Sequence, residues 1–115
     1  MRFVVHDTDA LSDPKVQRLL SRHGAASLAL FWAMVEAMCR DERPVDPEDV
    51  SAIAYQLHMG DAECSEMLAA MVSIGLLEDT DEGFSSARAM REVEHYKDVS
   101  EKRRKAINKR WGKNS

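Results

Sequence analysis

The stretch MLAAMVSIGLLEDTDEGFSS, residues 67–86, restricts the fold more than any other part of this chain. Its first half is apolar at helical spacing, which predicts an amphipathic helix. Gly75 ends that pattern, and two leucines then lead into a polar turn over residues 78–83. Gly83 can adopt the positive φ that such a turn usually needs. The sequence therefore predicts a helix followed directly by a two-stranded β-hairpin.

Two helices are predicted near the start of the chain, one directly after the other. Ser12 or Asp13 can cap the first, Pro14 suits its first position and Gly24 can end it. The second, over residues 25–42, is apolar nearly all round. We therefore expect it to be the buried central helix.

A third and a fourth helix complete the predicted core. Asp46 caps the third, Pro47 takes its first position and Gly60 ends it. Asp61 caps the fourth helix, which leads into the hairpin. Each has an apolar stripe, formed by Val50, Ile53, Ala54 and Leu57 in the third and by Cys64, Met67, Leu68, Met71 and Val72 in the fourth. A Met-rich stripe of this kind is typical of a core rather than of a cofactor site.

The remaining segments are two short extended pieces and a long helix. Residues 3–5 (FVV) and 43–45 (RPV) are predicted to be extended, and the second is expected to pair with the hairpin. Residues 87–111 contain no Gly or Pro, which predicts one long helix. Met90, Val93 and Tyr96 are expected to dock this helix on the body, whereas its more polar end is expected to fray in isolation.

Helices followed by a hairpin in this order are the arrangement of a winged helix-turn-helix. We predict a fold that is mainly α with a small β-wing. A chain of 115 residues suits one compact domain. We assign residues 1–96 to the winged-helix domain and residues 97–115 to a basic tail, helical or disordered. Cys39 and Cys64 lack the spacing of a zinc site and are predicted to be small buried hydrophobes.

The sequence HDTDALSDPKVQRLLSRHGAASLALFWAMVEAM, with a later IGLLE and a terminal KAINKRW, resembles the N-terminal domain of phage replisome-organiser proteins, relatives of the DnaD-type primosome proteins. The residues that carry the resemblance are His6, Asp7, Asp13, Lys15, Leu19, Gly24, Phe31, Trp32 and Trp111. It implies a winged-helix fold and a role in DNA replication initiation, through DNA binding or self-assembly. Longer members have a further C-terminal domain that these residues lack, so its activity is not expected here. The chain is either part of a longer protein or a short stand-alone member.

The predicted recognition helix is poorly suited to DNA. In a DNA-reading helix-turn-helix, the second helix enters the major groove and presents Arg, Lys, Asn or Gln to the bases. Here its exposed positions are Asp61, Glu63, Ser65, Glu66 and Ser73. Residues 44–87 contain ten acidic residues and no Lys or Arg, so this surface repels phosphates. Conventional groove reading is disfavoured.

The cations gather instead near the C-terminal end. Residues 97–115 hold eight Lys and Arg against two acids, whereas residues 1–96 hold eight against 18. Cations release counterions from DNA, and a Trp among them offers a stacking surface. We therefore predict DNA binding of low sequence specificity through this tail, by Lys102, Arg103, Arg104, Lys105, Lys109, Arg110, Trp111 and Lys113. A second candidate surface is a basic stripe on the first helix, formed by Lys15, Arg18 and Arg22.

These cations are also compatible with roles that involve no DNA. The tail can be a solubilising end or can fold back on the acidic body, and the stripe on the first helix can be an ordinary solvated face. The basic tail of one subunit can also lie across the acidic body of another, which favours self-association. The edge of the hairpin offers strand addition as a second route.

No enzyme, cofactor or membrane segment is expected. The sequence has no GxSxG, HExxH, P-loop or Rossmann motif. His6, Asp7 and Asp9 match no defensible metal-ligand spacing. The N-terminal ten residues do not resemble a signal peptide, and the longest apolar run, over residues 25–39, is too short to span a bilayer. A cytoplasmic location is therefore expected.

The function that these observations favour is a non-enzymatic winged-helix module in phage-type DNA replication initiation. It is expected to bind DNA through its tail, to self-assemble, or both, with other replication proteins as further partners. Two alternatives are a winged-helix transcriptional regulator, which needs sequence-specific operator binding, and a pure protein–protein adaptor, which binds no DNA even at low salt.

Overall fold

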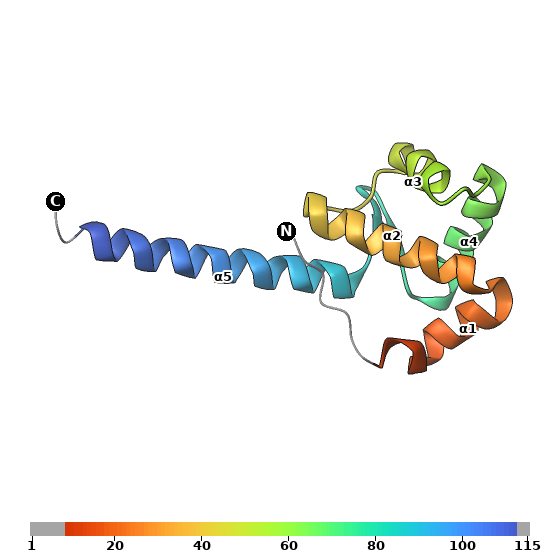
Figure 1. Cartoon of the computed structure of the whole chain (residues 1–115), viewed down its shortest axis with the longest axis horizontal. Helices are drawn as coiled ribbons and strands as arrows, with labels where there is room; N and C mark the ends of the chain where they lie inside the picture. The colour runs from red at the N-terminus through yellow and green to blue at the C-terminus, as the bar shows by residue number, and fades with distance from the viewer. Residues whose placement is uncertain (1–8, 113–115) are drawn as a thin grey trace.

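Helices dominate the structure, a computed structural model that describes residues 9–112, and two short antiparallel strands form its sheet (Figure 1). The elements run in the order η1 (Ala10–Ser12), α1 (Pro14–His23), α2 (Ala25–Asp41), η2 (Pro47–Asp49), α3 (Val50–Gln56), α4 (Asp61–Ile74), β1 (Glu78–Thr80), β2 (Gly83–Ser85) and α5 (Ala87–Gly112), where η denotes a 3₁₀ turn. The predicted mainly α composition with a small β element is confirmed. The extended segment predicted at residues 3–5 lies outside the described residues.

The predicted limits of α1 are confirmed. The carboxylate of Asp13 accepts a hydrogen bond of 2.8 Å from the backbone N–H of Lys15, and Pro14 takes the first helical position. Gly24 ends the helix with φ at 75°, and its N–H donates to the carbonyl of Leu20. The chain then enters α2 at once.

The third predicted helix is shorter than expected. Asp46 accepts a hydrogen bond from the N–H of Glu48, but the turn that it caps is the 3₁₀ turn η2. The α-helix ends at Gln56 and not at Gly60, because His58 adopts a left-handed φ of 55°. The N–H of His58 donates three residues back to Tyr55 and that of Met59 donates five residues back to Ala54, so neither continues the i→i−4 pattern of the helix.

The start of α4 also corrects a prediction. Gly60 occupies the N-cap position, with extended backbone, and no side chain caps the helix there. Asp61 is the first residue of the helix and not its cap. Together with Glu63 it places negative charge in the first turn, where the helix dipole favours it.

The hairpin is tighter than the sequence indicated. Residues 78–80, predicted as turn, form β1 and pair with β2 in the register Glu78↔Ser85, Asp79↔Phe84 and Thr80↔Gly83. Val45 pairs with Phe84 on the other side of β2 through two hydrogen bonds of 2.8 Å. The predicted pairing of residues 43–45 with the hairpin is therefore confirmed.

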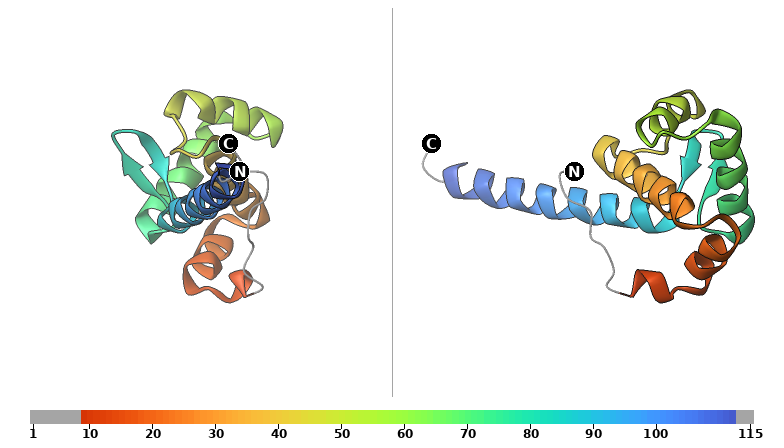
Figure 2. Two further views of the ribbon diagram at one scale, coloured as in Figure 1. Left: turned by 90° about the vertical axis from the view of Figure 1, so that its left-hand side faces the viewer. Right: turned by 45° about the vertical axis from the view of Figure 1, so that its right-hand side comes forward.

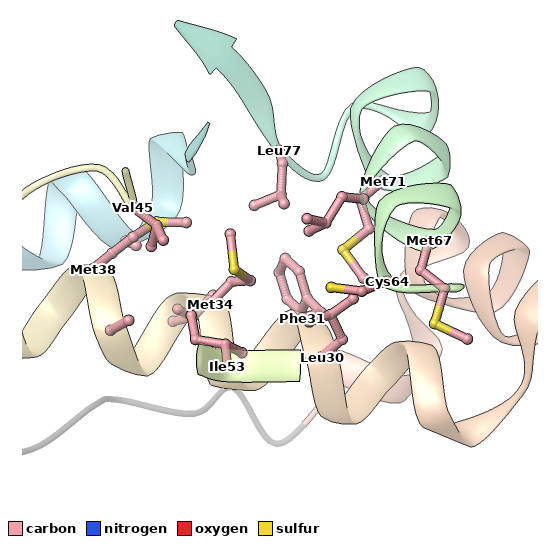
Figure 3. Packing of buried hydrophobic residues seen from close by; sticks show 14 of the residues in the cluster. Leu30, Phe31, Met34, Met38, Val45, Ile53, Cys64, Met67, Met71 and Leu77 are labelled. Carbon is pink, nitrogen blue, oxygen red and sulfur yellow. The ribbon is translucent and has the colours of Figure 1, made fainter. Parts of the chain in front are cut away.

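The core forms around α2, between α4 and the segments that carry Val45 and Leu77 (Figure 3). Leu30, Met34 and Met38 of α2 are fully buried, and Met71 and Leu77 close the core from the other side. Both cysteines are buried as predicted, and burial raises the pKa of the Cys39 and Cys64 thiols. They therefore pack as apolar side chains.

The last helix begins against the body and then leaves it. Ala89 and Val93 are buried against the core, and Met90 packs beside them. Tyr96, expected to dock, is 42% exposed. Beyond it α5 continues away from the other described elements, which gives the molecule a length of 60 Å (Figures 1 and 2). The predicted single long helix is confirmed, and within residues 9–112 no helix is long and apolar enough to cross a membrane.

Candidate nucleic-acid interface

The projecting half of α5 holds more cations than its acids can pair. Lys102 and Lys105 each form an i,i+4 ion pair of 3.2 Å, with Asp98 and Glu101 respectively. Those two carboxylates are the only acids in residues 97–112. Beyond Glu101, four further cations form no ion pair with any described residue, and they are Arg103, Arg104, Lys109 and Arg110. This excess of cations gives the segment a positive electrostatic potential.

The cations surround the helix instead of forming one stripe. Residues 102–105 are four consecutive cations, and successive side chains of an α-helix differ in direction by about 100°. All of them are exposed. A helix that is positive on every side can contact phosphates in many orientations, which suits binding without sequence preference.

An apolar pair interrupts this basic surface. Ile107 is 55% exposed and Trp111 is 67% exposed. They are four residues apart and share one face of α5. An indole ring in this position can stack on an unpaired base or enter a pocket of a partner protein. The last predicted contact residue, Lys113, lies outside the described residues.

The basic stripe of α1 is far from this end of α5. Lys15, Arg18 and Arg22 are exposed as predicted, but α1 lies at the end of the molecule opposite the C-terminal turn of α5 (Figure 1). The ammonium of Lys15 donates to the backbone carbonyl of Gly75 at 3.4 Å, which satisfies one carbonyl at the end of α4. The fold therefore does not combine the two predicted basic groups into one surface.

Two cations that the sequence did not single out lie close to the α1 stripe. Arg88 and Arg91, from the first turns of α5, line the same pocket as Lys15. The available signal was weak: residues 83–91 contain these two arginines and no acid. The proximity of α5 to α1 depends on the tertiary fold and has no signature in the sequence.

The surface of α4 and the hairpin is acidic, as predicted. Asp61, Glu63, Ser65, Glu66 and Ser73 are all exposed. Beside them is a groove of about 440 Å³ between η2, α4 and the hairpin. Apolar side chains line most of it, Asp79 is its one acidic residue among the described residues, and no described Lys or Arg lines it: the lining residues include Pro47, Val50, Leu68, Ala69, Val72 and Phe84.

The described residues form no recognisable metal site. Within residues 9–112, no group of three or more His, Cys, Asp or Glu side chains is placed to hold a metal ion. Of the three possible metal ligands in the HDTD stretch, Asp9 precedes η1, and His6 and Asp7 lie outside the described residues.

Comparison with known proteins identifies a family. Residues 3–89 match the family model described as Lin1244/Lin1753-like, N-terminal. No curated protein and no solved structure matches the chain. The matched region includes α1 to α4, the hairpin and the first turn of α5, and it stops before the basic half of α5.

Proposed function

Because the chain belongs to the Lin1244/Lin1753-like family of phage-type proteins through its N-terminal domain, we propose that it is a non-enzymatic module of phage-type DNA replication initiation. In this role it binds DNA with low sequence specificity through the projecting half of α5. The observation that carries the proposal is the set of four unpaired cations on a helix segment that is exposed on all sides.

We further propose that the body is a winged helix-turn-helix. The order α2, α3, α4 and hairpin supports this fold, and so does the pairing of Val45 with β2, which adds a third extended segment to the wing. The acidic surface of α4 argues against a transcriptional regulator that reads operators with this helix.

The test compares two double variants that lose the same charge. Arg103→Gln/Arg104→Gln removes two cations from α5, and Arg40→Gln/Arg43→Gln removes two cations from the body. Affinity for labelled duplexes of two unrelated sequences is measured by anisotropy over a range of salt concentrations. We expect the slope of log K against log salt to fall by about 2 for the α5 variant and to stay unchanged for the body variant.

The two duplexes should bind about equally, because phosphate contacts carry no sequence information. Equal slopes for the two variants would show that α5 does not hold the phosphates. A strong preference for one sequence would favour the regulator instead, and no binding by wild-type protein at low salt would favour the adaptor.

Self-assembly is a second candidate function, favoured by a different observation. Ile107 and Trp111 form an exposed apolar pair on a basic helix, and the groove beside α4 is apolar with acidic residues around it. The two surfaces are complementary in charge and polarity, so α5 of one copy suits the groove of a second copy.

A further inference from the structure

A second basic site lies on the body, where the start of α5 meets α1, α2 and the end of α4. It is a pocket of about 330 Å³. Lys15, Arg88 and Arg91 line it, and Asp13 is the one acidic residue among the described residues of its wall. Three cations and one carboxylate in a shared depression give a net positive pocket on a body that is otherwise acidic.

The carboxylate does not neutralise these cations. Asp13 accepts a hydrogen bond from the backbone N–H of Lys15, in its role as cap of α1. Neither Asp13 nor any other described acid forms an ion pair with Lys15, Arg88 or Arg91. Arginine and lysine side chains that converge without a carboxylate partner are the usual recognition elements for phosphate.

Two of the three cations are held in place by the fold. The ammonium of Lys15 donates to the carbonyl of Gly75, and the guanidinium carbon of Arg88 lies 6.0 Å from the centroid of the Trp32 ring. Arg91, one turn further along α5, is exposed at the pocket. A site whose charged groups are already positioned loses less conformational entropy when it binds its ligand.

The first turn of α5 adds to the positive potential. Ser86 and Ala87 line the pocket, and the hydroxyl of Ser86 accepts from the N–H of Ala89 as the cap of this helix. The amino end of a helix has a partial positive charge, which adds to the charge of the three side chains.

We propose that this pocket binds a phosphate group, with Arg91, Arg88 and Lys15 as its ligands. A phosphate of a nucleic-acid strand and the phosphate of a free small molecule share this chemistry. The site is independent of the DNA binding proposed for the projecting half of α5, because none of residues 97–112 lines it.

The test uses the full chain with Trp111→Phe. The sequence has two Trp residues, so Trp32 is then the one that remains. Inorganic pyrophosphate is titrated at constant ionic strength, and binding is followed by calorimetry and by Trp32 emission. We expect saturable binding and a change in Trp32 emission, because Arg88 contacts this ring. Arg91→Gln should weaken binding about tenfold or more, since a charge-assisted contact is lost.

Arg43→Gln is the control, since it removes one exposed cation of the body that does not line the pocket, and it should leave pyrophosphate binding unchanged. Absence of saturable heat, or equal weakening by the control and by Arg91→Gln, would overturn the proposal. Far-ultraviolet circular dichroism confirms that each variant is folded; Arg91 is exposed, so its substitution should not disturb the core.

Competition then identifies the source of the phosphate. A short single strand with a 5′-phosphate and the same strand without it are added to the pyrophosphate complex. Displacement by both strands assigns an internal backbone phosphate, and displacement by the phosphorylated strand alone assigns a strand end. Displacement by neither assigns a free small molecule; each of these three results supports a phosphate site. Because Arg91→Gln weakens this site and none of residues 97–112 lines it, failure here does not affect the DNA-binding proposal.

Discussion

Gly83 begins β2 and lies directly against the backbone of Val45, in the segment before η2. Its φ is 122°, a conformation that L side chains rarely adopt, and a Cβ at this position would collide with the backbone carbonyl of Val45. The same carbonyl accepts the hydrogen bond from Phe84 that adds Val45 to the sheet. Glycine is therefore required for two reasons: the positive φ of this residue and the lack of room for a Cβ beside Val45.

We predict that Gly83→Ala lowers the free energy of unfolding by about 2 kcal/mol or more, because it combines backbone strain with a backbone clash. Gly60→Ala is the matched control, since Gly60 has extended backbone and nothing within 4 Å of an added Cβ. It should change stability by less than about 0.5 kcal/mol, because the weaker N-cap and the stiffer unfolded chain offset each other. Urea denaturation measures both, and equal losses would contradict the steric explanation.

Single residues also mark where the sequence predicts local structure well and where it does not. Asp13, Pro14 and Gly24 act within a few residues of their own positions, so their cap and stop signals predict the limits of α1 correctly. His58 has a left-handed φ directly after α3, and the sequence pattern did not predict a helix end at this residue. The sequence offered Gly60 as the stop signal, and the chain leaves the helix before reaching it.

At the scale of the elements, α5 is one helix with two different environments. Its first turns contain Val93, which is 2% exposed and part of the core. Its outer half contains Ala106, which is exposed and lies within the basic segment. The two halves should therefore contribute differently to stability.

We predict that Ala106→Pro disrupts the outer half of α5 without destabilising the body, because proline removes a helical hydrogen bond and clashes with the preceding turn. Circular dichroism should show a loss of helix, whereas the midpoint of core unfolding, followed by Trp32 emission in the Trp111→Phe background, should stay within about 2 °C. Val93→Ala should do the reverse, keeping most of the helix and destabilising the core by about 2 kcal/mol. A fall in the core midpoint with Ala106→Pro would show that the outer half packs on the body.

The elements differ in how far the sequence predicts them. The helices have periodic apolar faces, and those faces reflect burial in the core directly. The strand β1 has three exposed residues, Glu78, Asp79 and Thr80, with no apolar alternation, so its composition is typical of a turn. Its pairing with β2 supplies the structure that its own composition does not indicate.

At the scale of the whole molecule, charge is separated along the longest dimension. The acidic surface of α4 and the hairpin belongs to the body, and the unpaired cations of α5 lie at the far end (Figure 2). The sequence predicts this asymmetry from counts alone. It does not predict the pocket of Lys15, Arg88 and Arg91, because α1 and α5 are distant in sequence and only the fold places them together.

We predict that self-assembly, if it uses the groove, can be restored by mixing two defective variants. Ala69→Arg places a cation in the groove, and Ile107→Ser/Trp111→Ser removes the apolar pair of α5. Each variant alone should have a lower mass than wild type in light scattering at the same concentration. Their equimolar mixture should regain dimers, because one intact groove can then meet one intact α5.

An assembly made by α5 pairing with α5 would behave differently in this experiment. Ala69→Arg alone would then keep the wild-type mass, and mixing it with the α5 variant would return none of the α5 variant to dimers. Wild-type protein that is monomeric at every concentration would remove self-assembly altogether.

The straight course of α5 also fixes a spacing. Arg91 at the pocket and Lys109 on the projecting half are eighteen positions apart, which is five full helical turns, so they lie on the same face of α5 at a spacing of about 27 Å. That length equals about eight base pairs of duplex. The helix thus sets the distance between the two proposed phosphate contacts: duplexes shorter than about eight base pairs can occupy one contact at a time, and longer ones can span both.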